Sequence, residues 1–119
     1  MYSVQLLDHF QNPRNAGELA DADAMAEIEN PACGDALRLT LKASAGRITQ
    51  ARFKAKGCVA AIACGSVLTE LVVGKTFNEA QGLQREDLIL AVGGLPQASA
   101  HAAELALESL SIALSRIRV

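Results

Sequence analysis

Residues 37–56 read LRLTLKASAGRITQARFKAK, and apolar and polar residues alternate on both sides of the small segment Ser44-Ala45-Gly46. Side chains of a strand point alternately to opposite faces, so this alternation predicts two strands that each have one buried and one wet face. The small residues predict a turn, and the alternation shifts by one residue at Ile48, which predicts a bulge. We therefore expect an antiparallel hairpin whose wet face is basic through Arg52, Lys54 and Lys56.

Helical patterns surround this hairpin. We expect an opening helix over residues 2–10, with Val4, Leu6, Leu7 and Phe10 on one face, and a further strand over 24–30. After the hairpin the apolar period changes to about 3.6. This predicts helices over residues 59–73, 77–83, 86–92 and 101–117. Strands and helices in separate runs predict an α+β domain with helices packed on one face of an antiparallel sheet. No stretch has the composition of a linker, so residues 1–119 are expected to form one domain.

Charge and hydropathy argue against a nucleic-acid-binding protein and against a membrane-spanning or secreted protein. The formal net charge of −2 gives no general field for attracting nucleic acid. No apolar run approaches the length that spans a bilayer, and the first residues lack the basic and apolar regions of a secretory signal. We therefore expect a cytoplasmic protein without a membrane partner. In a reducing cytosol its three cysteines indicate metal binding or thiol chemistry rather than disulfides.

Side chains that bind metals lie at the ends of the predicted elements. Cys33 and Asp35 precede the first hairpin strand, Cys58 follows the second, and His101 lies near the start of the last helix. Antiparallel pairing puts the start of one strand beside the end of the other, so Cys33 and Cys58 should be neighbours. Cys58 also opens a helix, where the macrodipole is expected to lower the pKa of its thiol. Thiolates, an imidazole and a carboxylate together suit zinc or a two-iron cluster of mixed ligation.

Each of these residues taken alone also fits a purely structural role. Free cysteines are often buried as small apolar side chains, and a lone histidine on a surface helix needs no ligand. Cys64 is the clearest case, because on a continuous helix it lies about 9 Å beyond Cys58 along the axis. That separation is too large for two ligands of one zinc ion. We therefore expect Cys64 to be a buried packing residue.

Several motifs, in their order and spacing, resemble one family. They are Asp8-His9-Phe10-Gln11-Asn12-Pro13-Arg14-Asn15, Asn30-Pro31-Ala32-Cys33-Gly34-Asp35, Ala51-Arg52-Phe53-Lys54 and Gly57-Cys58. Over nearly its full length the chain is similar to the IscU/NifU-type scaffold proteins of iron-sulfur cluster assembly. The resemblance implies a three-stranded antiparallel sheet with helices packed on one face, the SufE/NifU-like fold.

The resemblance also implies a function. Such scaffolds receive sulfur from a pyridoxal-phosphate cysteine desulfurase and combine it with ferrous iron. They hold a labile 2Fe-2S cluster, or a zinc or iron ion, and pass the cluster to apo-proteins; they are carriers rather than enzymes. Cys33, Asp35, Cys58 and His101 match the family's ligand positions, so the resemblance makes these four the expected metal and cluster ligands.

The chain departs from the family pattern in two places. Where the family has a His-Cys pair at the start of the last helix, this chain has His101-Ala102. In several members the missing cysteine accepts the persulfide. Where the family binds its chaperone through Leu-Pro-Pro-Val-Lys, this chain has Leu95-Pro96-Gln97-Ala98-Ser99. The resemblance therefore carries over the ligand His101, but neither persulfide acceptance nor chaperone binding.

Two other functions remain open from the sequence. A paralogue could keep the fold and a zinc site, dock on a cysteine desulfurase through Arg52, Lys54 and Lys56, and modulate it without building clusters. An enzyme could use Cys58 as a nucleophile with His101 as its base. We rank the enzyme lower, because the sequence offers no oxyanion-hole loop and no third group to orient the base.

Overall fold

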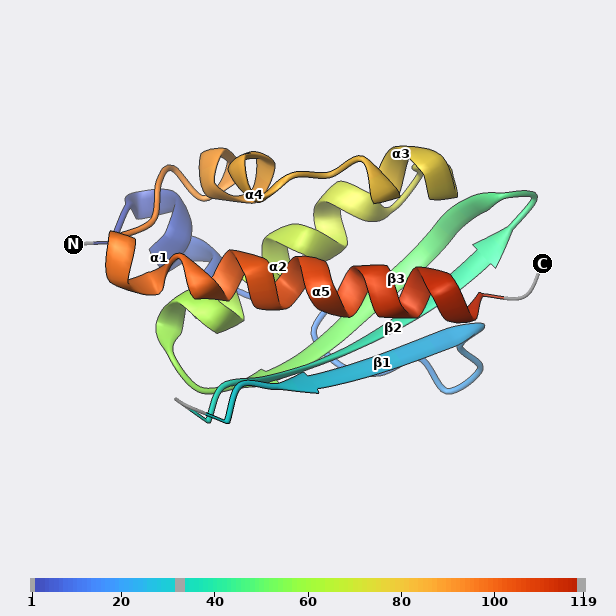
Figure 1. Ribbon diagram of the computed structural model, residues 1–119, viewed down its shortest axis with the longest axis horizontal. Coiled ribbons are helices and arrows are strands. Elements are labelled where there is room, and N and C mark those ends of the chain that lie inside the picture. Colours follow the sequence, from blue (N-terminus) through green and yellow to red (C-terminus); the bar gives the residue numbers. More distant parts are fainter. Residues whose placement is uncertain (1, 32–33, 118–119) are drawn as a thin grey trace.

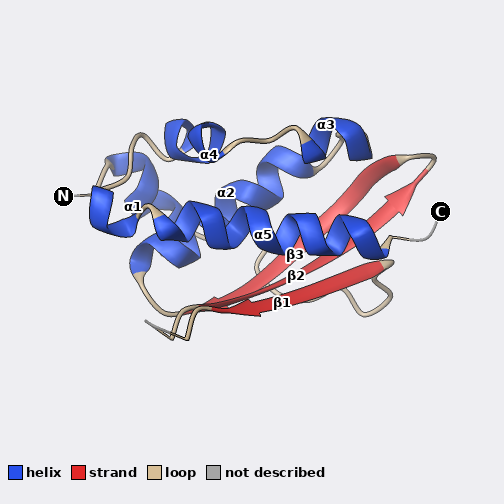
Figure 2. Ribbon diagram, in the orientation of Figure 1, coloured by secondary structure: helices blue, strands red, loops and turns tan. Residues whose placement is uncertain are grey.

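A computed structural model describes residues 2–31 and 34–117 of the chain. Its elements follow in the order α1 (Val4–Gln11), β1 (Ala24–Glu29), β2 (Ala36–Ser44), β3 (Arg47–Lys56), α2 (Val59–Val72), α3 (Phe77–Gln81), α4 (Arg85–Ala91), the 3-10 turn η1 (Gln97–Ser99) and α5 (His101–Arg116). The strands form an antiparallel sheet in the order β1-β2-β3. The helices lie on one side of this sheet, and α5 runs along it (Figures 1 and 2). The α+β fold predicted from the sequence is confirmed.

The predicted hairpin is present with its bulge. Ser44 pairs with Arg47 across a two-residue turn, and the register shifts where Lys42 faces Gln50 while Ala43 faces Ile48. Ala45 and Gly46 both have positive φ angles, as a tight primed turn between twisted strands requires. The leucines of β2 and the apolar residues of β3 point into the core, with Leu37, Leu39, Leu41, Ile48, Ala51 and Phe53 all buried.

Helix α2 lies at the centre of the core because it is built from small residues. Most of its length is buried, including Cys64 and Gly65. A Cβ placed on Gly65 would come within 2.6 Å of the Phe53 ring on β3. A larger residue at this position would push the helix off the sheet. The close approach of α2 to the sheet, predicted from its run of alanine and glycine, is thereby confirmed.

The single apolar face predicted for α1 holds at Leu6 but is wrong at Val4 and Leu7. Val4 is 81% exposed and Leu7 is 38% exposed, whereas Leu6 and His9 are buried. The reason is a polar contact, which a pattern of apolar residues cannot predict. His9 Nδ1 lies 2.7 Å from the hydroxyl of Ser66 on α2, and this buried hydrogen bond turns the His9 side of α1 towards the core.

The segment between α1 and β1 closes the outer edge of the sheet. The Gly17 N–H donates to the Phe53 carbonyl at 2.8 Å, and the Phe53 N–H donates to the Asn15 carbonyl at 3.0 Å. This pairing covers part of an edge strand that would otherwise present free backbone groups. Among the described residues, no helix is both long and apolar enough to cross a bilayer.

Candidate metal centre

Three of the four predicted ligands meet at one end of the sheet. Asp35 comes directly before β2, whose first residue Ala36 pairs with Lys56, the last residue of β3. Two residues later Cys58 caps the N-terminus of α2, and α5 begins at His101. A carboxylate oxygen of Asp35, Sγ of Cys58 and a ring nitrogen of His101 all lie within 4.8 Å of one another. Residues distant in the sequence therefore converge here, whereas the predicted proximity of Cys33 to Cys58 falls outside the described residues.

Asp35 lies between the other two side chains and is only 3% exposed. Its Oδ1 accepts a hydrogen bond from the Cys58 backbone N–H at 3.0 Å. Its Oδ2 lies 3.2 Å from Cys58 Sγ, where the thiol donates to the carboxylate, and 3.3 Å from His101 Nε2. A buried carboxylate that contacts a thiol and an imidazole through one oxygen is a preorganised set of three donor atoms.

The spacing of these atoms suits a metal ion. Ligand atoms of a tetrahedral zinc, at bond lengths near 2.0–2.3 Å, stand about 3.3–3.8 Å apart. The two contacts of Asp35 Oδ2, at 3.2 and 3.3 Å, are already close to that range. Small side-chain adjustments would therefore bring the three donors around one ion. Thiolate, imidazole and carboxylate are also the donor types that zinc accepts.

Gly57 makes the approach of Asp35 to Cys58 possible. Its φ of +124° is open to glycine and rarely adopted by other residues. A Cβ built on Gly57 would lie 2.7 Å from Cγ and 2.9 Å from Cα of Asp35, and closer still to Oδ1. Any larger residue would collide with the carboxylate. The sequence identified this glycine only as part of the Gly57-Cys58 motif, although its place directly before a candidate ligand was a usable signal.

The predicted lowering of the Cys58 pKa is wrong. Burial raises the pKa of the Cys58 thiol, and the hydrogen bond and negative charge of Asp35 raise it further. The helix N-terminus does act in the predicted direction, since the backbone N–H of Ala61 donates to Sγ at 3.4 Å and lowers the pKa. Desolvation and the neighbouring carboxylate outweigh it. Without a metal, Cys58 is therefore a protonated donor to Asp35.

Of the other two cysteines, Cys33 and Cys64, the structure describes only Cys64. Cys33, the fourth predicted ligand, lies outside the described residues. Cys64 is fully buried in α2, and burial raises the pKa of its thiol to about 12. It is also absent from the group of described residues whose ligand atoms gather at Asp35. The burial predicted for Cys64 is confirmed. Ala102, beside His101, is buried as well.

Sequence reasoning also missed a polar cluster that holds the Asn-Pro-Arg-Asn turn against α2. The Ser66 hydroxyl contacts His9 and accepts a hydrogen bond from the Arg14 backbone N–H at 2.9 Å. The Asn15 side chain donates to the Thr69 hydroxyl at 3.2 Å, with Asn15 itself at a φ of +59°. These contacts fix the N-terminal segment on the core. The turn motif itself was the signal, but its partners on α2 could not be read from it.

Comparison with known protein families identifies the family of this chain. The profile of the NifU-like N-terminal domain matches residues 1–118. The chain belongs to this family. Solved structures agree on the fold of this NifU-like domain: the N-terminal part of a nitrogen-fixing NifU-like protein from Brucella abortus superposes with a TM-score of 0.78 at 22% identity, covering 97% of this chain and 92% of the other.

Curated relatives of this NifU-like domain carry scaffold names. The iron-sulfur cluster assembly scaffold protein IscU 1 of Archaeoglobus fulgidus is 43% identical, and the match covers 96% of this chain and 74% of the relative. The scaffold protein IscU of Aquifex aeolicus is 44% identical, over 95% and 73% of the two chains. The scaffold protein IscU of Escherichia coli is 37% identical, over 96% and 91%. The resemblance stated from the motifs is confirmed.

Proposed function

We propose that this protein is an iron-sulfur cluster assembly scaffold whose cargo site consists of Cys33, Asp35, Cys58 and His101. The observation that carries the proposal is the convergence of three of these side chains, from three separate elements, within 4.8 Å. Membership of the NifU-like family and the names of the IscU relatives support it. Cys33 would complete the set as the second thiolate, because it stands two residues before Asp35.

Each of the four residues would have a role in binding that follows from the donor atom of its side chain. Cys58 and Cys33 would supply thiolates, the soft ligands that iron-sulfur clusters and zinc prefer. His101 would bind through Nε2, the ring nitrogen that already faces Asp35. A thiol must lose its proton to ligate, so cargo binding would release the proton that Cys58 now donates to Asp35 Oδ2. Asp35 would then be freed to act as a ligand itself.

Lability is the property expected of this donor set. A carboxylate is a harder and weaker ligand for iron in a sulfur-bridged pair than a thiolate is. With Ala102 next to His101, Asp35 would have to take a coordination position that a third thiolate could fill. A labile 2Fe-2S cluster, or a zinc or iron ion between rounds of assembly, suits a protein that passes its cargo on.

A cluster carrier of this kind needs a protein that supplies sulfur and a protein that receives the cluster. The source of sulfur would be a cysteine desulfurase, and the destination would be apo-proteins that receive the cluster. The chain would act on neither as a catalyst. Its contribution would be a site that assembles the cluster and binds it weakly enough to release it.

The test is anaerobic reconstitution with ferrous iron, sulfide and a reductant, followed by an absorption spectrum and an assay of iron and sulfide. We expect a visible chromophore with two irons and two sulfides per cluster in the wild type, and none in Cys58→Ser. Cys64→Ser is the matched control and should keep the chromophore, because Cys64 is buried away from the cluster of ligand atoms. Zinc binding without any chromophore would favour the paralogue that binds metal but builds no cluster.

A further inference from the structure

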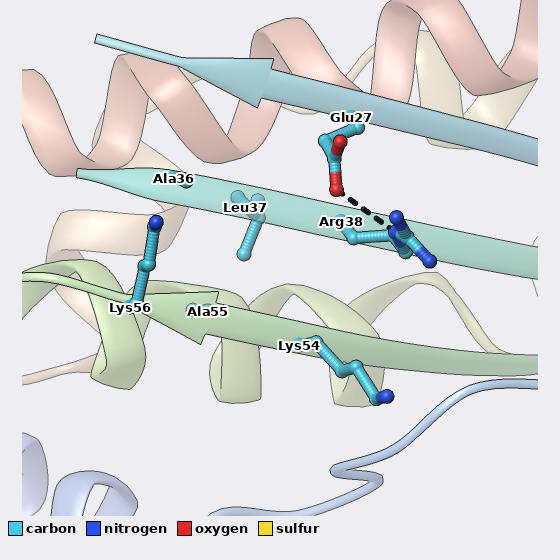
Figure 3. Close-up of a pocket in the computed structure, with 7 residues that line it drawn as sticks. All are labelled: Glu27, Ala36, Leu37, Arg38, Lys54, Ala55 and Lys56. Atoms are coloured by element: carbon cyan, nitrogen blue, oxygen red, sulfur yellow. Dashed lines mark hydrogen bonds and ion pairs between the residues drawn. The ribbon is translucent and has the colours of Figure 1, made fainter. Parts of the chain in front are cut away.

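The face of the sheet turned away from the helices carries a hollow of about 290 Å³ where β2 begins and β3 ends. Glu27, Arg38, Lys54 and Lys56 stand around it (Figure 3). The short side chain of Ala36 leaves the space between them: Figure 3 shows Lys56 on one side of it and the Arg38–Glu27 pair on the other. The hollow is thus a charged depression rather than an apolar groove.

Positive charge along β3 is only partly compensated within the fold. Arg38 on β2 is fully engaged, with Nε 2.9 Å from Glu27 Oε1 and Nη1 3.0 Å from Glu18 Oε1. Lys54 shares that same Glu18 oxygen from 3.8 Å. Lys56 makes no ion pair with any residue in the described ranges 2–31 and 34–117. In a chain of net charge −2, this is a local excess of positive charge.

Arg52 extends the same row. Its guanidinium is exposed and donates to the Ala16 carbonyl at 3.5 Å, and it makes no ion pair with a carboxylate in the part of the chain that the structure describes. Arg52, Lys54 and Lys56 occupy alternate positions of β3 and are all exposed. We call these three residues the basic row. Alternate residues of a strand lie about 6.6–6.8 Å apart on one face. An extended peptide with acidic residues at alternate positions has the same repeat.

The basic row ends beside the candidate metal centre. Lys56 is followed directly by Gly57 and Cys58, and Ala36 is preceded directly by Asp35. Whatever binds along the row therefore reaches the end of the sheet at which two of the proposed ligands lie. The surface combines a charge pattern, a matching repeat and a position that a protein exchanging cargo with this site would need.

We propose that the basic row docks an extended acidic segment of a partner protein, with carboxylates at alternate positions. Docking there places the partner at the end of the sheet where Cys58 lies. That the docked partner exchanges sulfur, iron or a cluster with the centre rests on the proposed function; the docking itself does not.

The test is a nuclear magnetic resonance titration of the whole chain at about 20 mM salt, where exposed charges are weakly screened. The probe is the peptide Gly-Glu-Ala-Glu-Ala-Glu-Gly, and the matched control peptide is Gly-Ala-Glu-Glu-Glu-Ala-Gly, with the same composition and charge. We expect the alternating peptide to bind more tightly and to shift the backbone resonances of residues 52–56.

Two double variants that remove lysine charges test whether the peptide binds at the basic row. An exposed ion pair changes affinity by a factor of about two to five, so Lys54→Gln with Lys56→Gln should weaken binding about four- to 25-fold. Lys42→Gln with Lys75→Gln removes the same charge elsewhere and should change binding less than two-fold. Equal binding of both peptides, equal weakening in both double variants, or tighter binding of a DNA oligonucleotide at the row would each overturn the proposal.

Metal content separates this proposal from the proposed function. The Lys54→Gln, Lys56→Gln variant should hold as much zinc as the wild type. If the wild type binds no metal but the alternating peptide still binds at the row, the proposed function fails and the docking surface stands. If metal binds at Cys58 and the peptide shows no preference for the row, only the docking surface fails.

Discussion

Replacing Gly57 by alanine should damage the candidate centre without touching any proposed ligand. The new Cβ would lie 2.7 Å from Asp35 Cγ and 2.9 Å from Asp35 Cα, and one of these is backbone that cannot swing away. A non-glycine residue at a φ of +124° costs about 1–3 kcal/mol. Losing the hydrogen bond from the Cys58 N–H to the carboxylate adds about 1.5–3 kcal/mol.

Together these effects predict that Gly57→Ala lowers the free energy of unfolding by about 2.5–6 kcal/mol. A chain of 119 residues has about 6–18 kcal/mol in total, so the variant should still fold. Gly46→Ala is the matched control: Gly46 also has a positive φ, of +78°, but no atom lies within 4 Å of its Cβ position. It should lose only the backbone strain, about 1–2 kcal/mol.

The assay is urea unfolding of both variants, together with their zinc content. Gly57→Ala should be less stable than Gly46→Ala by about 1.5–3 kcal/mol, the contribution of the lost hydrogen bond, and should bind less than half the zinc of the wild type. Equal stability of the two variants, with full zinc content in Gly57→Ala, would refute the role assigned to the contact between Gly57 and Asp35.

Three further predictions follow from burial and charge. Burial lowers the pKa of His9 below its ordinary 6.5, so its contribution to stability is complete above that pH and is lost as pH falls through the folded-state pKa. His9→Asn should flatten the pH dependence of urea unfolding below about pH 6.5 relative to wild type. Cys64 should react with a thiol reagent much more slowly than half-buried Cys58, and equal rates would contradict its burial. Ala102→Cys should lengthen the lifetime of a reconstituted cluster by adding a thiol beside His101; an unchanged lifetime would show that the missing thiol is not limiting.

The sheet and the position of the site could be predicted because both depend on local patterns. Alternation of leucine with polar residues identified β2, and a pairing through the turn at Ala45 and Gly46 set the register. That register was predicted to put Cys33, which lies outside the described residues, beside Cys58; in the structure Ala36 faces Lys56, and Asp35 lies beside Cys58. His101 was predicted as a ligand from the family motifs, because the predicted hairpin gave no information on its position.

The failed predictions concern contacts between distant elements. The inner face of α1 was misassigned because His9 is buried by its hydrogen bond to Ser66, and hydrophobic periodicity treats both as polar surface. The pKa of the Cys58 thiol was predicted from its helix terminus alone. Its actual direction depends on burial and on a carboxylate 23 positions earlier in the chain, whose approach needs the backbone conformation of Gly57.

The most direct test of the central claim is elemental analysis of purified protein for zinc and iron. We expect about one metal ion per chain in the wild type and in Cys64→Ser, because Cys64 is buried outside the group formed by Asp35, Cys58 and His101. We expect almost none in the Cys33→Ser, Cys58→Ser double variant, which lacks both proposed thiolates. Undiminished metal in that folded double variant would contradict the assignment of the centre.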